Sequence, residues 1–222
     1  MRAKRKRASR VWHGGIFAIV LAAMIAQVAL VVQGGTDVNA TDPTVHQSVP
    51  MRLVQLFSYF TIQSNLLVLL ASGLLALRPD RDGRLWRVLH LDALLGIVIT
   101  GIVFALVLAP LIHPTGVAWA VNAAFHYVSP VAFLIGWLVF GPRGQADGTT
   151  AWLAFLWPVA WIAYTFARGA QTGWYPYPFL DAAELGYPRA ALNTALVLLA
   201  AFCLAALAQW TDRRLTRVAV RT

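Results

Sequence analysis

Two apolar stretches of the chain carry polar side chains at helical spacing, and polar groups inside membrane-type sequence are costly and mark candidate sites. Each stretch holds three of them on one helical face: Ser58, Thr61 and Asn65 in residues 51–77, and Asn122, His126 and Ser129 in residues 118–140. Thr61 lies roughly 15 Å below the expected outer end of its helix, and His126 lies roughly 12 Å below that of its own. We therefore expect the two side chains at a common depth.

A hydroxyl beside an imidazole is the minimal apparatus for nucleophilic catalysis. The neutral ring accepts the hydroxyl proton while the oxygen attacks an ester carbonyl, and it returns the proton to the leaving alcohol. This pattern predicts Thr61 as nucleophile and His126 as base. Four neighbours on the same faces are expected to bind substrate: Ser58, Asn65, Asn122 and Ser129. Alternatively, both polar faces only join helices through hydrogen bonds.

Two features of the sequence are expected to shape the pocket around this pair. Pro130 has no N–H for the carbonyl of His126, so the helix is expected to bend there. The connection RGAQTGWYPYPFLDAAELGYPR is aromatic and locked by prolines, which favours a segment packed against the mouth of the bundle. From this region we expect Trp174, Tyr177 and Asn193 to contribute to substrate binding.

The spacing of the residues does not identify the group that orients His126. Asp92 lies roughly 9 Å in height from the candidate pair, so we expect a structural role for it, paired with His90 or with an inner arginine. Three residues of the outer half are better placed to reach the pocket: Asn193, Tyr164 and Arg168.

Several other chemistries are excluded. The chain has no P-loop, dinucleotide fingerprint, HExxH or GxSxG motif. Cys203 is its single cysteine, which rules out an internal disulfide and a cysteine-cluster metal site. His13 and His90 lie near the inner end of the bundle and His113 near the outer end, so no partner for a bis-histidine haem lies at the depth of His126. We expect neither a metal nor a cofactor.

Composition defines the elements that position these residues. With 59% hydrophobic and 12% charged residues, the 222-residue chain has too few charges to cover a surface in water. Apolar stretches long enough to cross a bilayer run over approximately 12–32, 51–77, 88–112, 118–140, 151–168 and 189–210. The sequence predicts an all-α bundle of six transmembrane helices over residues 12–210, between basic tails at 1–11 and 211–222. The first stretch is too long for a secretory signal and no cleavage site follows it, so we expect it to be retained.

The basic residues predict the orientation. Fifteen Lys and Arg residues flank the stretches on one side and three lie on the other, namely Arg52, Arg168 and Arg189. By the positive-inside rule the basic side is cytoplasmic, which places both termini in the cytoplasm and the chain in the plasma membrane as a multi-pass protein. Because these charges flank apolar blocks instead of interleaving with exposed aromatics, the net charge of +9 does not predict nucleic-acid binding.

Three segments resemble a known family. FSYFTIQSNLL, AFHYVSP and TGWYPYPFLD, in this order, are similar to the androgen-induced (FAR-17a/ADTRP-like) integral membrane proteins and, more closely, to their bacterial Pr6Pr-type members. The matching residues are His126 and Pro130 of an HxxxP motif, with Thr172, Gly173 and Tyr177-Pro178-Phe179-Leu180. Around Thr61 this chain is richer in Gln, Ser and Asn than the animal members.

The resemblance implies six helices and a threonine hydrolase that cleaves fatty acid esters of hydroxy fatty acids, with Thr61 and His126 as nucleophile and base. The leading hypothesis is thus an intramembrane lipid-ester hydrolase whose partners are membrane lipids and a lipid-ester substrate. The pocket is expected to open toward the outer leaflet beneath the WYPYPFL segment. The alternative is a non-catalytic membrane protein, either a lipid or small-solute carrier or a scaffold.

The arginine asymmetry generates a topology prediction. In a background lacking Cys203, single cysteines at Asn39 and Glu184 should react with an impermeant thiol reagent applied to intact cells, whereas one at Asp82 should react only after lysis. Labelling at Asp82 in intact cells would contradict the orientation with both termini inside.

Overall fold

The computed structural model describes residues 3–34 and 48–221, so Asn39 lies outside the described residues. The described chain is helical, with no strand. Its α-helices are α1 (Ala3–Val32), α2 (Val49–Ser58), α3 (Phe60–Leu77), α4 (Arg84–Val103), α5 (Gly116–Ala123), α6 (Ser129–Phe140), α7 (Gly148–Ala154), α8 (Leu156–Thr172), α9 (Ala182–Leu185) and α10 (Tyr187–Arg221). Two π-helical turns, η1 (Phe104–Leu108) and η2 (Ala124–Val128), and a 3₁₀ turn, η3 (Pro178–Leu180), complete the set.

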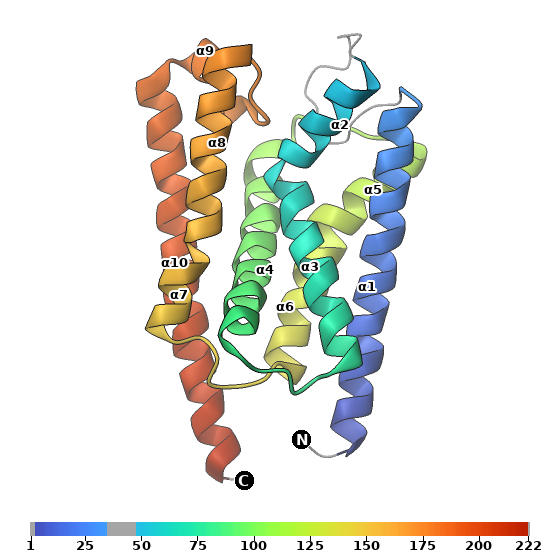
Figure 1. The fold of residues 1–222 in the computed structure, drawn as a ribbon, viewed down its shortest axis with the longest axis vertical. Coiled ribbons are helices and arrows are strands. Elements are labelled where there is room, and N and C mark those ends of the chain that lie inside the picture. Colours follow the sequence, from blue (N-terminus) through green and yellow to red (C-terminus); the bar gives the residue numbers. More distant parts are fainter. Residues whose placement is uncertain (1–2, 35–47, 222) are drawn as a thin grey trace.

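Six helical segments are long and apolar enough to cross a membrane, which confirms the predicted number. They are Ala3–Val32, Phe60–Leu77, Arg84–Leu108, Gly116–Phe140, Gly148–Thr172 and Tyr187–Arg217. The beginning of α1 and the end of α10 lie at the same end of the bundle (Figure 1). This is the architecture of a multi-pass membrane protein.

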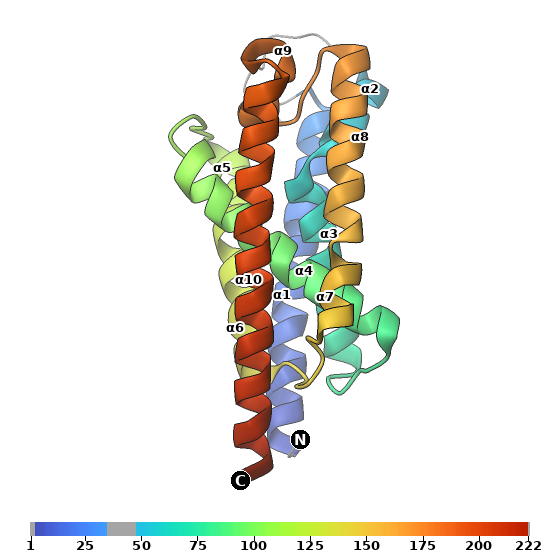
Figure 2. The same cartoon turned by 90° about the vertical axis from the view of Figure 1, so that its left-hand side faces the viewer.

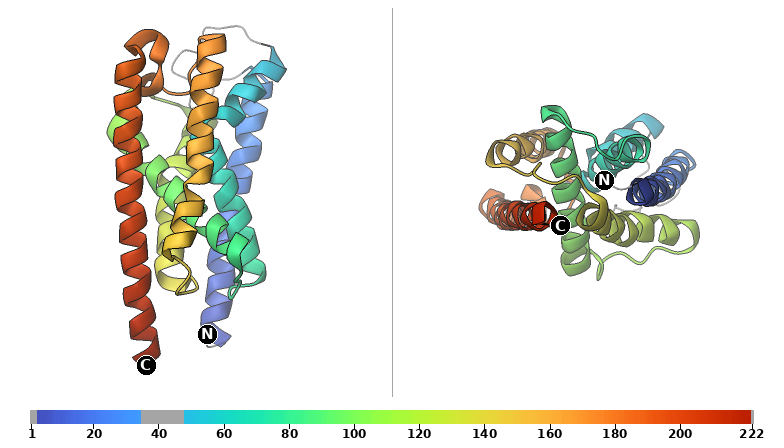
Figure 3. Two further views of the ribbon diagram at one scale, coloured as in Figure 1. Left: turned by 60° about the vertical axis from the view of Figure 1, so that its left-hand side comes forward. Right: turned by 90° about the horizontal axis from the view of Figure 1, so that it is seen from below.

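Helix α4 is the centre of the arrangement. It contacts α3, α6, α7 and α10. Helices α8 and α10 lie on one side of it and α1 lies on the other (Figures 1 and 3). Helix α10 runs along the whole length of the molecule (Figure 2). Only 17% of the residues in its most apolar 18-residue stretch are buried within the protein, so most of its surface is left for lipid.

The two basic ends, expected as tails, continue the first and last helices. Lys and Arg are good helix formers and no Gly or Pro interrupts these ends, so α1 begins at Ala3 and α10 extends to Arg221. Asp212 is buried on this extension. Its carboxylate accepts hydrogen bonds from the backbone N–H groups of Gly144 (3.1 Å) and Ala146 (3.0 Å), which fixes α10 to the connection between α6 and α7.

A polar cluster joins two connections at the same end. Arg87 donates two hydrogen bonds to the carboxylate of Asp82 (2.7 and 2.9 Å), and these bonds lower the pKa of Asp82 to about 2. Gln145 donates to Asp82 (3.1 Å) and accepts from the indole N–H of Trp86 (3.1 Å). The connection before α4 and the one before α7 are thereby held together.

The predicted helix over residues 51–77 is interrupted at Tyr59. Tyr59 has extended backbone angles (φ −68°, ψ 133°), so α2 ends at Ser58 and α3 begins again at Phe60. Its own N–H still donates to the carbonyl of Leu56 (3.2 Å), and its carbonyl accepts from Ile62 (3.1 Å). This break was not predicted, and it places Thr61 in the first turn of a helix.

Each π-helical turn ends two residues before a proline. In η1 the N–H of Ala109 donates to the carbonyl of Phe104 (2.8 Å), ahead of Pro110, and η2 precedes Pro130 in the same way. A proline removes one helical donor and clashes with the carbonyl four residues back, and widening the preceding turn accommodates both effects. The bend expected at Pro130 is thus realised as a wider turn that contains His126.

The WYPYPFL segment packs against the bundle, which confirms that prediction. Tyr175, Tyr177 and Leu180 are buried. Gly169 on α8 makes room for this segment, because a Cβ at this position would lie 2.2 Å from the ring of Tyr175. The side chain of Asn193 on α10 donates to the carbonyl of Phe179 (2.8 Å). The segment is therefore fixed to both α8 and α10.

Replacing Gly169 with alanine should displace the segment. The added methyl group overlaps the ring of Tyr175, so we expect the variant to lose about 1–3 kcal/mol of stability and to melt at a lower temperature in detergent. Gly15→Ala is the matched control, because nothing lies within 4 Å of a Cβ there and alanine favours the helix. Equal melting temperatures for Gly169→Ala and the parent would refute this packing.

Candidate active site

Thr61 lies at the start of α3 with its side chain buried. The first N–H groups of a helix have no carbonyl acceptor within the helix. The N–H of Thr61 donates instead to the hydroxyl of Tyr177 (3.1 Å). The same hydroxyl lies 3.2 Å from Oγ1 of Thr61. The partial positive charge of a helix N-terminus also acts at this residue.

His126 lies opposite Thr61 and is 2% exposed. Its Nε2 is 3.4 Å from Oγ1 of Thr61, and its Nδ1 is 3.1 Å from the carbonyl oxygen of Asn122. A carbonyl can only accept, so Nδ1 carries the proton and Nε2 presents its lone pair to the threonine hydroxyl. The orienting group is therefore a backbone carbonyl one turn earlier in the same helix.

The imidazole ring is also held by an aromatic contact. Phe104, the first residue of η1, stacks on His126 with ring centroids 3.9 Å apart and an interplanar angle of 18°. Close approach of the two π-helical turns depends on Gly101. A Cβ there would lie 3.0 Å from Pro130 and 3.4 Å from the carbonyl oxygen of His126. Phe104 and the Asn122 carbonyl together leave the ring little freedom.

Tyr177 is positioned by other aromatic rings. Its ring contacts those of Tyr59 and Trp161 edge-on or tilted, at 5.6 and 6.1 Å, and stacks on Phe179 at 5.3 Å. The indole N–H of Trp161 donates to the carbonyl of Ser58 (2.8 Å), the last residue of α2. The break between α2 and α3 and the hydroxyl of Tyr177 are thus held by one aromatic cluster.

Asn65 connects the two helices that carry the pair. Its side-chain N–H₂ donates to the carbonyl of Thr61 (2.9 Å) and to the carbonyl of Phe125 (3.4 Å). The second acceptor is the residue before His126. Asn65 therefore keeps Thr61 and His126 at the same depth, as expected from the sequence, although it does not itself line the cavity described next.

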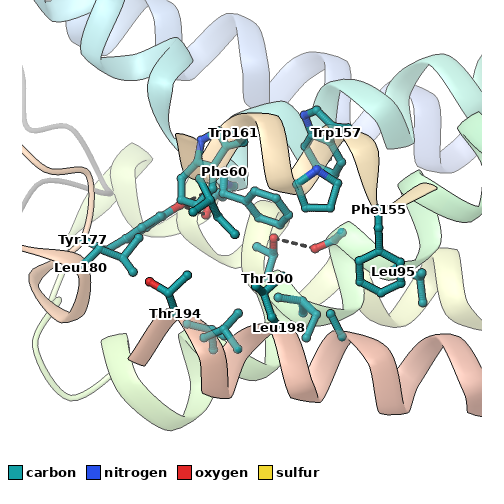
Figure 4. Close-up of a pocket in the computed structure, with 18 of the residues that line it drawn as sticks. Phe60, Leu95, Thr100, Phe155, Trp157, Trp161, Tyr177, Leu180, Thr194 and Leu198 are labelled. Carbon is teal, nitrogen blue, oxygen red and sulfur yellow. Dashed lines mark hydrogen bonds between the residues drawn. The ribbon is translucent and has the colours of Figure 1, made fainter. Parts of the chain in front are cut away.

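An apolar cavity begins at Thr61. Residues of α3, α4, η1, α7, α8, η3 and α10 line it, and its empty space of about 860 Å³ includes the part that opens to the outside of the protein. Tyr177 and Leu180 lie at one end, and Leu95 and Phe155 lie at the other (Figure 4). The cavity is long, mostly hydrocarbon-lined and polar at few places, as ligand-binding cavities generally are.

Two helices supply most of the cavity wall that the sequence did not predict. The lining residues of α4 are Asp92, Leu95, Gly96, Ile99, Thr100 and Val103, and those of α10 are Thr194, Val197, Leu198 and Ala201. Both sets repeat at intervals of three and four residues, which was the available signal. The hydroxyl of Thr100 donates to the carbonyl of Gly96 (2.8 Å), and that of Thr194 donates to Ala190 (2.8 Å).

Asp92 differs most from its expected role. It lines the cavity, and in the described chain no hydrogen bond or ion pair joins its carboxylate to His90 or to an arginine. His90 instead stacks on Trp86, with ring centroids 4.8 Å apart. The expected structural pairing of Asp92 is therefore wrong.

Other expected site residues lie outside the cavity wall. Ser58 donates to the carbonyl of Val54 (2.6 Å) and lies 2.7 Å from the hydroxyl of Tyr164. Trp174 packs edge-on against Tyr59 and beneath the guanidinium of Arg168, 4.5 Å from its ring centroid. The remaining three residues contact other parts of the protein. The carbonyl of Asn122 accepts from His126, the side chain of Asn193 donates to the carbonyl of Phe179, and Ser129 is buried beside Pro130.

The functional groups around Thr61 indicate which reactions the site can support. In residues 3–34 and 48–221 no group of three or more His, Cys, Asp and Glu side chains could hold a metal ion. Thr61 and Tyr177 line the cavity with a hydroxyl, a helix N-terminal N–H and a phenol, and the imidazole of His126 contacts Thr61 without lining the cavity itself. Such a set can transfer an acyl group by attack of the hydroxyl oxygen on a carbonyl carbon, with the imidazole moving the proton.

The role of Asn65 gives a stability prediction. Asn65→Asp keeps the shape but replaces the donor with an oxygen that faces two carbonyls, so we expect a loss of about 1–3 kcal/mol and a lower melting temperature. Ser72→Ala on the same helix is the control, because the buried Ser72 hydroxyl has no partner among the described residues. If both variants melt with the parent, Asn65 does not join the two helices.

Comparison with the known proteins leaves the site to be judged from its geometry. No protein-family model, curated protein or solved structure matched the chain. The contacts of Thr61 and the cavity beside it are therefore the basis for a functional assignment.

Proposed function

We propose that this protein is an intramembrane lipid-ester hydrolase in which Thr61 is the nucleophile and His126 the general base. The observation that carries the proposal is the 3.4 Å approach of His126 Nε2 to Thr61 Oγ1, because Thr61 also lines a mostly apolar cavity. A distance of 3.4 Å is compatible with proton transfer, because such hydrogen bonds tighten when substrate binds.

The reaction has two halves. Nε2 takes the hydroxyl proton of Thr61 while Oγ1 attacks the ester carbonyl, and the imidazolium returns this proton to the alcohol that leaves. A water molecule then attacks the acyl-threonine with His126 again as base, and Thr61 regains its proton as the carboxylic acid departs. The Asn122 carbonyl stabilises the imidazolium by accepting from Nδ1 in both halves.

Tyr177 and the helix terminus stabilise the negative charge that develops on the ester oxygen. The phenol O–H and the N–H of Thr61 are the donors nearest to Oγ1. A substrate carbonyl oxygen that enters between them receives both hydrogen bonds and the favourable field of the α3 N-terminus. One such donor is typically worth about 10²- to 10³-fold in rate.

The cavity suggests the substrate class. Its hydrocarbon walls fit an extended acyl chain, and the resemblance to the androgen-induced family points to fatty acid esters of hydroxy fatty acids. The arginine asymmetry supports an orientation with the termini in the cytoplasm and Tyr177 toward the outer leaflet of the plasma membrane, and we propose that the substrate enters from that leaflet. A lipid carrier would use the same cavity without needing Thr61 or His126.

Hydrolysis by single variants tests the assignment. Thr61→Ala and His126→Ala should each lower turnover of a long-chain lipid ester by about 10²- to 10⁴-fold in nanodiscs, and the double variant should lose little more, because the two residues act as one unit. Thr61→Ser should retain activity.

Thr165→Ala is the control, since this buried threonine of α8 does not line the cavity. It should hydrolyse the ester like the parent. Normal folding and parental turnover in both Thr61→Ala and His126→Ala would show that the nucleophile and base assignments are wrong, and no turnover by the folded parent would favour a carrier.

A further inference from the structure

Asp92 is the one acidic side chain among the described residues that line the cavity. It is partly buried on α4, and no described residue makes a hydrogen bond or an ion pair with its carboxylate. Every other polar side chain on the wall, Thr61, Thr100, Tyr177 and Thr194, has a partner within the protein. A carboxylate left without a partner at membrane depth is costly and is a functional candidate.

The distance from Asp92 to Thr61 follows from the helices. The hydroxyl of Thr100 lies 3.3 Å from that of Ser64, so these two residues share a level. Asp92 lies eight residues from Thr100 along α4, and Ser64 lies three residues from Thr61 along α3. At about 1.5 Å per residue, roughly 16 Å of height along the helices separate Asp92 from Thr61, more than the sequence suggested.

The wall between these two points is apolar. Leu95, Ile99 and Phe155 face the cavity, and Gly96 lets the ring of Trp157 lie against α4, since a Cβ at Gly96 would be 2.9 Å from it. An acyl chain whose ester lies at Thr61 therefore runs along hydrocarbon until it reaches a carboxylate. A methyl end leaves that carboxylate without a hydrogen bond, and a second carboxylate is repelled by it.

We propose that Asp92 selects esters whose chain carries a hydrogen-bond donor, a hydroxyl or an amine, about a dozen carbons from the ester carbonyl. The inference rests on the proposed hydrolase function for the position of the ester. If the substrate is a hydroxy-fatty-acid ester, the chain that carries its free carboxylate then lies outside the inner end of the cavity. Asp92 is a specificity residue and takes no part in proton transfer at Thr61.

The test compares fluorogenic esters with one chain length and different ends. The parent protein in nanodiscs should hydrolyse ω-hydroxydodecanoyl and ω-aminododecanoyl esters with kcat/KM at least about tenfold above the dodecanoyl ester, and the ω-carboxy ester should be the poorest. An ω-hydroxyhexanoyl ester should gain nothing over its unsubstituted analogue, because its hydroxyl does not reach Asp92.

Three variants assign the preference to the carboxylate. Asp92→Leu should remove or reverse the preference for donor-ended chains, and Asp92→Asn should remove the preference for the amine while keeping part of that for the hydroxyl. Thr194→Val, elsewhere on the wall, should leave both preferences unchanged. Equal kcat/KM for all chain ends in the parent, or an intact preference in Asp92→Leu, would overturn the proposal.

A binding measurement separates this inference from the hydrolase function. Dodecanediol should raise the melting temperature of the Thr61→Ala protein more than dodecanol does, and Asp92→Leu should abolish the difference. If the parent hydrolyses none of the esters but the diol still binds through Asp92, the hydrolase function fails and the selectivity of the cavity stands. If the two alcohols stabilise equally, the selectivity fails.

Discussion

The hydroxyl of Tyr177 joins a segment outside the helical bundle to the first turn of α3, 3.1 Å from the Thr61 nitrogen and 3.2 Å from its Oγ1. This contact exists because α2 ends at Ser58 and α3 restarts at Phe60, which leaves the N–H of Thr61 without a helical acceptor. An unpaired N–H in hydrocarbon costs several kcal/mol, so the interrupted helix and the phenol depend on each other. Thr61 and Tyr177, the two partners in this contact, both line the cavity.

The imidazole side of the site depends on two helices that each carry a proline, Pro110 and Pro130. Each proline removes a helical donor, and each is preceded by a π-helical turn, one with Phe104 at its start and the other with His126 at its centre. Gly101 lets these wide turns approach, and Phe104 then stacks on the imidazole. Irregular helix is costly in a membrane, and here it coincides with the residues that could do chemistry, as expected for a functional site.

The sequence predicted the parts of the fold that follow from hydrophobic length and residue counting. Six spanning helices and the common depth of Thr61 and His126 are of this kind. The break at Tyr59 could not be predicted, because no Gly or Pro lies at residues 58–60 and the extended conformation is stabilised by Tyr177 from far along the chain. The α4 wall was missed because the polar residues on it resemble ordinary helix contacts until α10 is placed beside them. Asp92 was misassigned for the same reason.

If Thr61 is the nucleophile, a fluorophosphonate should lose fluoride and phosphonylate its Oγ1. After the purified protein reacts with a long-chain fluorophosphonate, tandem mass spectrometry of the modified peptide should place the adduct on Thr61, with no adduct on the nearby hydroxyls of Ser58, Ser64 or Thr100. The discrimination is sharp because Thr61 alone of these four has His126 Nε2 within 3.5 Å. An adduct on another hydroxyl, or none on folded protein, would contradict the assignment of Thr61 as the nucleophile.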